Sequence, residues 1–140
     1  MTLKVKFITT DPSMKPTKAH PDDAGFDLRA ACHYGLNEHA RLVRTGVHVN
    51  IPPGYVGLMS VRSSVAMYGV EMANAPGIID AGYTGEVKLA LKADRGYTLF
   101  RGERVAQLVI VPTPCVELVE TDAFEETERG TGGFGSSGKD

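Results

Sequence analysis

The sequence is short of several features that mark large classes of protein. It has no tryptophan and two cysteines, Cys32 and Cys115, which are far apart and too few for a disulfide framework. Because no signal peptide precedes them, we expect reduced core thiols in a cytoplasmic protein. No apolar run approaches the roughly 20 residues that a membrane helix needs, so we expect no membrane association.

An excess of charge of one sign is also missing. The 15 Lys and Arg and 17 Asp and Glu residues give a formal charge of −2. Such a chain lacks the basic surface that binds a duplex, so we expect no direct nucleic-acid binding beyond a single nucleotide. The four histidines show no paired metal spacing, and neither a Walker loop nor a Gly-x-Ser-x-Gly elbow is present.

Alternation of apolar and polar residues dominates what is present. It occurs in residues 3–7, 47–51, 87–91 and 116–120, and a period of two predicts strands with one face on a core. Residues 105–111 are nearly all apolar, which predicts a strand buried on both faces. Turns rich in Pro and Gly at short spacing are typical of a sandwich or barrel. We expect one short helix, at residues 64–68.

Length and composition divide the chain into two parts. A chain of 140 residues suits a single domain with its own core, which we place at residues 1–128. Residues 129–140 are rich in glycine and cannot pack a core of their own. We therefore expect them to form a flexible C-terminal arm.

Five local clusters could carry chemistry, and each also has a purely structural interpretation. Residues 24–30 place Asp27 in a short apolar strand, where an Asp–Arg pair would explain it. Arg62, Ser63 and Ser64 open the short helix and are suited to phosphate oxygens, or the serines simply cap the helix. The amide of Gln107 lies in an apolar strand and needs partners, from the backbone or from a ligand.

Residues 74–86 and 129–138 are the two richest clusters. Pro76-Gly77 and Ala81-Gly82 predict turns, and the two apolar residues before Asp80 suggest a partly desolvated carboxylate that could deprotonate water. The structural alternative is a hairpin in which this acid caps a turn. The second cluster is either a frayed terminus or a segment whose aromatic ring, glycine amides and hydroxyls close over a base and its phosphates.

Taken together and in this order, the clusters resemble the five motifs of the trimeric dUTP diphosphatase (dUTPase) family. The match runs from about residue 24 to residue 138. Its most specific parts are Gly-x-Ile-Asp-x-x-Tyr-x-Gly-Glu at 77–86 and Arg-Gly-x-Gly-Gly-Phe-Gly-Ser at 129–136. The resemblance implies an all-β, distorted jelly-roll of the β-clip type. It also implies a Mg²⁺-dependent homotrimer with active sites shared between subunits.

The activity that the resemblance implies is hydrolysis of dUTP to dUMP and pyrophosphate by water attack on the α-phosphorus. This reaction limits uracil incorporation into DNA and supplies dUMP for dTMP synthesis. Asp80 would be the catalytic residue that activates water, and Asp27 would hold a water on Mg²⁺. Tyr83 would lie under the deoxyribose and exclude a 2′-hydroxyl.

The resemblance assigns the other substrate-binding positions to three groups, which read uracil, approach the phosphates, or close over the nucleotide. In that order the groups are Asn74, Gly77, Ile78 and Ile79; Arg62, Ser63, Ser64 and Gln107; and Arg129, Phe134, Gly135, Ser136 and Ser137. Lys88 would lie where the family's strand again approaches the nucleotide.

Two alternatives share the implied fold. A dCTP deaminase, or a bifunctional enzyme, would carry a similar Arg-Ser-Ser sequence, but it would have a glutamate on the strand after Asp80, where Ala90 stands. A non-catalytic nucleotide-binding regulator would be expected to lack Asp80. Within the main resemblance, Ser64 replaces a common glycine and so adds a side chain near the phosphates.

Overall fold

The structure is a computed structural model that describes residues 2–135 and 138. Apart from two short helical turns, its regular elements are strands, as the alternation predicts. The helical turns are η1 (Pro12–Met14) and α1 (Ser63–Ala66). The strands are β1 (Lys6–Thr9), β2 (Phe26–Arg29), β3 (Tyr34–Leu36), β4 (Arg41–Asn50), β5 (Tyr55–Val61), β6 (Val70–Met72), β7 (Gly77–Ile79), β8 (Glu86–Ala93), β9 (Tyr97–Leu99) and β10 (Arg104–Pro112).

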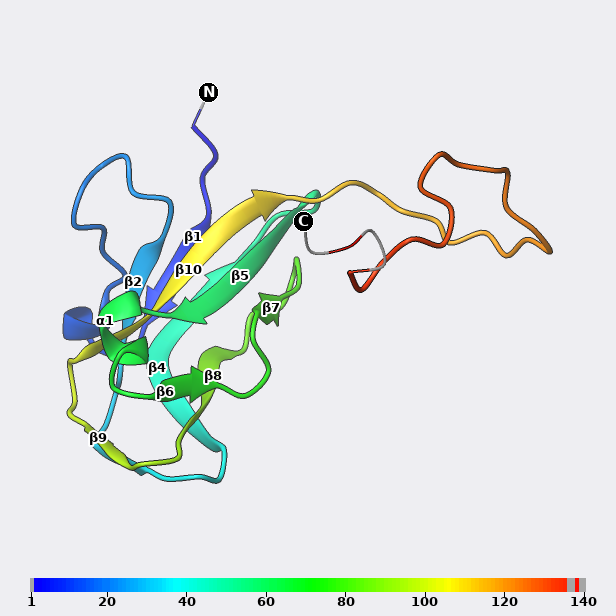
Figure 1. Ribbon diagram of the computed structural model, residues 1–140. Coiled ribbons are helices and arrows are strands. Elements are labelled where there is room, and N and C mark those ends of the chain that lie inside the picture. Colours follow the sequence, from blue (N-terminus) through cyan, green and yellow to red (C-terminus); the bar gives the residue numbers. More distant parts are fainter. Residues whose placement is uncertain (1, 136–137, 139–140) are drawn as a thin grey trace.

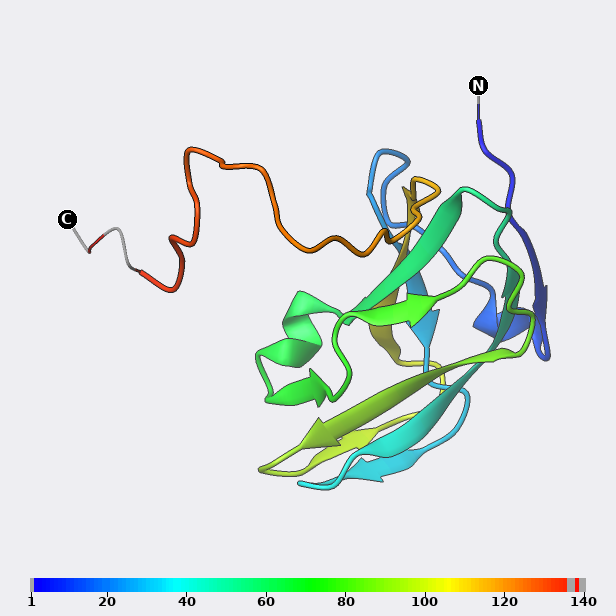
Figure 2. The same cartoon turned by 90° about the vertical axis from the view of Figure 1, so that its right-hand side faces the viewer.

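The strands form two four-stranded sheets and a small two-stranded one. The sheet orders are β1-β4-β8-β6, β2-β10-β5-β7 and β3-β9, and every pairing among these strands is antiparallel. The two larger sheets lie against each other (Figures 1 and 2), and one buried cluster takes side chains from both. This is the all-β, jelly-roll-like fold that the resemblance implied.

The predicted alternation is confirmed where a strand lies inside a sheet. In β8, Val87, Leu89 and Leu91 are buried, whereas Lys88 between them is exposed. The strand at 105–111 is central in its sheet, but its second half is only partly buried. The expected short helix is present, but it begins one residue early and ends two residues early, at Ala66. The turn after the helix closes at Gly69, whose amide donates to the carbonyl of Ala66 at 2.9 Å and whose φ is +84°.

The pairing of β4 with β8 contains a register shift that side chains repair. The hydroxyl of Thr45, which is fully buried, donates to the carbonyl of Val87 at 2.6 Å and accepts from the amide of Val47 at 3.2 Å. The Glu86 carboxylate accepts from the amide of Gly46 at 3.3 Å. These bonds satisfy backbone groups that the interrupted ladder leaves unpaired.

Two predicted strands are not built as expected. β1 begins only at Lys6, so Leu3 lies before the strand. Leu3 and Phe7 remain exposed, at 41% and 44%, and β1 is an edge strand whose own residues are largely exposed. Residues 116–120 form no strand, and Leu118 is 94% exposed. A strand needs a partner for its backbone, and Figure 2 shows the segment after β10 running away from the body.

The cysteine prediction is correct in part. Both Cys32 and Cys115 are free thiols, but Cys115 is exposed and Cys32 only half-buried, so neither is a fully buried core residue. Cys115 follows β10 on the segment that leaves the body, where there is no core to enter. No helix in the described part of the chain is long and apolar enough to cross a membrane.

Candidate functional site

A polar pocket of about 290 Å³ lies where β5 ends beside β10 and β2. It brings together four residues that the sequence singled out from three separate clusters. Antiparallel pairing explains part of this, because Gln107 on β10 stands opposite Asp27 on β2. The lining residues are Ala19, Asp23, Ala24, Gly25, Asp27, Arg62, Ser63 and Gln107.

Asp27 is the electrostatic centre of this pocket. Its side chain is 11% exposed, with one oxygen 3.2 Å from Arg62 Nε and the other accepting from Arg104 Nη1 at 3.3 Å. Two guanidinium groups therefore offset the cost of burying the carboxylate. The predicted Asp–Arg pair exists, but the nearby Arg29 is not part of it and instead donates to the carbonyl of Gly102.

Sequence reasoning did not select Arg104 as a site residue. Its signal was present, because Arg104 belongs to the 102–107 cluster from which only Gln107 was chosen. The preceding turn is held by Glu103, which accepts from the hydroxyl of Tyr97 at 2.6 Å and from the amide of Phe100 at 3.1 Å. The hydrogen bond between the Tyr97 hydroxyl and Glu103 is the largest of the causes that raise the pKa of Tyr97 to about 12; desolvation of the phenol is the next.

The two serines at the start of α1 do not act as its cap. The cap position is Arg62, which makes no side-chain capping hydrogen bond, so the capping interpretation is wrong. Ser63 lines the pocket and Ser64 is exposed beside it. Across the pocket, a Cβ atom at Gly25 would lie 2.8 Å from Gln107 Oε1. The absence of a side chain at Gly25 therefore leaves room for the Gln107 side-chain amide.

The second group of predicted residues surrounds β7. Asn74 and Asp80 are exposed, so the expected partial desolvation of the carboxylate is not seen in the single chain. The hairpin of the structural alternative, in which Asp80 would cap the turn, is also absent, because β7 before this residue and β8 after it belong to different sheets. Gly77 and Ile79 are buried whereas Ile78 is 62% exposed, so at the two buried positions only the backbone is available to a ligand.

Tyr83 lies at the end of a tight turn after β7. The turn is closed by a bond from the amide of Tyr83 to the carbonyl of Asp80 at 3.2 Å, and Gly82 adopts a φ of +82° within it. This confirms the turn predicted at Ala81-Gly82. The Tyr83 side chain is 49% exposed, and its hydroxyl donates to the carbonyl of Glu86 at 3.2 Å.

Asp80 and the polar pocket lie at opposite ends of β5. Ile79 pairs with Gly57, which puts Asp80 beside the start of β5, whereas Arg62 follows its end. The six steps from residue 56 to residue 62 span roughly 20 Å at about 3.3 Å each. Figures 1 and 2 agree, since α1 and the far end of β7 are well separated in both views. One chain therefore does not bring the two groups together.

The remaining predicted residues join neither group. Lys88 is exposed on β8, in the other sheet. On the arm, Arg129 donates to the carbonyl of Gly132, and Phe134 is fully exposed next to Gly135 on a segment that extends away from the body (Figure 2). Ser136 and Ser137 lie outside the described residues.

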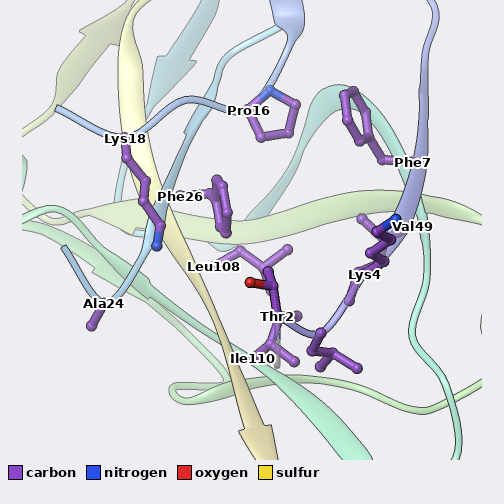
Figure 3. Close-up of a pocket in the computed structure, with 12 residues that line it drawn as sticks. Thr2, Lys4, Phe7, Pro16, Lys18, Ala24, Phe26, Val49, Leu108 and Ile110 are labelled. Carbon is purple, nitrogen blue, oxygen red and sulfur yellow. The ribbon is translucent and has the colours of Figure 1, made fainter. Parts of the chain in front are cut away.

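Two other features bear on the choice of site. An apolar groove of about 520 Å³ lies between β1 and β2, where Phe7 and Phe26 line it (Figure 3). The groove contains no acid and none of the predicted site residues, so it is not the candidate site. Within the described residues, no cluster of three or more His, Cys, Asp or Glu could hold a metal ion.

Comparison with known proteins gives a consistent result. The dUTPase family model matches residues 11–138. Deoxyuridine 5′-triphosphate nucleotidohydrolase of Mycobacterium bovis (strain BCG / Pasteur 1173P2) is 44% identical over 149 residues, covering 99% of this chain and 97% of that protein. Its counterpart in Gloeobacter violaceus is 43% identical over 129 residues, 88% of each chain.

Solved structures agree with the sequence comparison. The dUTPase of Staphylococcus bacteriophage 80alpha with dUPNHPP superimposes with a TM-score of 0.87 at 32% identity, over 99% of this chain and 100% of that one. Both the family model and the curated relatives span most of the sequence, and the fold is shared along its whole length. The chain belongs to the dUTPase family.

Proposed function

We propose that this protein is a dUTP diphosphatase that hydrolyses dUTP to dUMP and pyrophosphate by water attack on the α-phosphorus. In the cytoplasm this would limit uracil incorporation into DNA and supply dUMP for dTMP synthesis. The observation that carries the proposal is the polar pocket, where Arg62, Ser63 and Gln107 surround a buried acid. Guanidinium, hydroxyl and amide groups are the donors that phosphate oxygens require.

Asp27 fits the role of a metal-positioning group. Members of the family generally use a divalent metal ion, and we propose Mg²⁺ here. Mg²⁺ keeps several waters and binds through one or two carboxylates and the substrate phosphates, so a single pocket carboxylate suffices. The oxygen of Asp27 that contacts Arg62 would become available for a metal-bound water when this arginine turns to the phosphates. Arg104 would retain the other oxygen.

The base would be read by the segment around β7. This strand is at the edge of its sheet, and its outer edge has no partner strand in the described part of the chain. Its backbone groups, with Asn74, are therefore available to hydrogen-bond uracil. A site built from such donors and acceptors rejects cytosine strongly, because a mismatch leaves buried polar groups unpaired. Asp80 would orient and deprotonate the attacking water, and Tyr83 would lie under the deoxyribose.

The separation of the two groups supports shared sites. A nucleotide whose α-phosphorus lies at Asp80 and whose phosphates lie at Arg62 needs these residues close together, and one chain holds them roughly 20 Å apart. We propose a homotrimer in which Asp80 of one subunit faces the polar pocket of another. Residues 129–140 would form the closing arm, with Phe134 on uracil and Arg129, Gly135, Ser136 and Ser137 at the phosphates. Lys88 would approach the same site.

The deaminase alternative has less support. Ala90 is half-buried on β8, at the position where that enzyme would carry its glutamate, and it offers no acid. A deaminase also has no use for the Tyr83 and Phe134 rings that the 77–86 and 129–136 motifs supply.

Product analysis tests the proposal directly. The purified protein is incubated with dUTP, dCTP or dTTP, with and without Mg²⁺, in ¹⁸O-labelled water. We expect turnover of dUTP only, dependence on the metal, and label in dUMP. Label in pyrophosphate would place the attack elsewhere, and ammonia released from dCTP would favour the deaminase.

A further inference from the structure

Gly85 leaves a notch that the Tyr83 side chain fills. A Cβ atom added at Gly85 would lie 2.4 Å from Tyr83 Oη, 2.6 Å from Cζ and 3.0 Å from Cε2. Real Cβ atoms do not approach other heavy atoms this closely, so the ring rests directly against the Gly85 backbone. The hydroxyl then reaches one residue further and donates to the carbonyl of Glu86 at 3.2 Å.

A left-handed backbone does not explain why this position is glycine. Gly85 is not among the glycines with positive φ, so the left-handed conformation that favours glycine is not the reason for it. Gly82 in the preceding turn is the opposite case, because it has a φ of +82° and open space around its Cβ position. The obstacle to a side chain at Gly85 is thus the Tyr83 ring itself.

We propose that Gly85 is a specificity-determining positioning residue, which acts by fixing the place of the Tyr83 ring. The inference rests on the proposed function, in which this ring lies under the deoxyribose. The Tyr83 ring excludes a 2′-hydroxyl sterically only while its distance from the sugar stays fixed. Contact with the Gly85 backbone and the hydrogen bond to the Glu86 carbonyl together fix the position of the ring and therefore this distance.

Gly85→Ala should therefore change specificity and leave the fold intact. The atoms that must move are the far end of a half-exposed side chain, so the ring can swing into solvent without opening the core. We expect the ratio of kcat/KM for dUTP to that for UTP to fall about tenfold, within the range set by small steric differences in a binding site. Gly35→Ala, on β3 with nothing near its Cβ position, is the matched control and should leave the ratio unchanged.

A double-mutant cycle shows whether the effect passes through Tyr83. Tyr83→Ala should lower the same ratio, and adding Gly85→Ala to it should lower the ratio no further. An unchanged ratio in either single variant, or a further fall in the double variant, overturns the inference.

A crystal structure of Gly85→Ala separates this inference from the proposed function. We expect the Tyr83 hydroxyl to have left the Glu86 carbonyl. A ring that has not moved overturns the inference even in an active dUTP diphosphatase. A displaced ring supports the positioning role of Gly85, and absence of dUTP turnover by the wild-type protein would then count against the proposed function alone.

Discussion

Mixing two inactive variants should restore activity if the site is shared between chains. One variant is Asp80→Asn, which keeps the polar pocket. The other is Arg62→Ala, which keeps Asp80 and leaves Asp27 paired with Arg104, so no buried charge is left without a partner. Because the two substituted positions are roughly 20 Å apart in one chain, neither change should disturb the other group.

The expected recovery follows from the geometry. In a ring of identical subunits, each site takes Asp80 from one chain and Arg62 from its neighbour. A site works when the first chain is the Arg62→Ala variant and the second is the Asp80→Asn variant. With equal amounts and random assembly, this arrangement occurs at about a quarter of the sites, so activity should return to about a quarter of the wild-type value. If each chain built its own site, every site would carry one defect.

The assay is co-refolding followed by measurement of dUTP turnover, with mass spectrometry to show that mixed oligomers have formed. Each variant refolded alone is the control and should remain inactive. Mixed oligomers whose activity stays at the parental level would refute the shared site and require Asp80 and Arg62 to meet within one chain.

Three further predictions concern single positions. Asp80→Asn should keep nucleotide binding and lose turnover by about 10²–10⁴-fold, the usual contribution of a positioned base, as shown by comparing kcat with nucleotide affinity. Thr45→Val should lower the free energy of unfolding by about 1–3 kcal/mol, because the methyl cannot replace the buried hydroxyl's hydrogen bonds; urea unfolding at fixed protein concentration measures this. Thr45→Ser keeps the hydroxyl and should cost less, about 1 kcal/mol for the lost methyl group. The pKa of Tyr97 is raised from 10.0 to about 12, mainly by Glu103, so the folded state favours the neutral phenol. The stability that this provides is complete below about pH 10 and is lost as the pH rises to about 12, and Glu103→Gln should bring the ultraviolet titration of this phenol back toward 10.0.

Local pattern was enough to predict the interior strands and the turns. The alternation at 87–91 and 47–51 gave the correct buried faces, because the direction of side chains in a strand depends only on its period. It failed at 116–120, where the same alternation has no partner strand among the residues that the structure describes. Hydrogen bonding between strands is not local, so a pattern shows a capacity for pairing and not the partner.

The sequence by itself determined the family and therefore the candidate residues, because the 77–86 and 129–136 motifs each lie within one short segment. Only the tertiary structure decided how those residues group. It paired Asp27 with Arg62 and Arg104 rather than with Arg29, because antiparallel pairing and chain reversal bring residues 77 positions apart within 3.3 Å. It placed Asp80 at the other end of β5 from Arg62, and it put the Tyr83 ring against Gly85. These contacts depend on strand register and on the direction in which each side chain leaves the backbone, which the order of residues along the chain does not reveal.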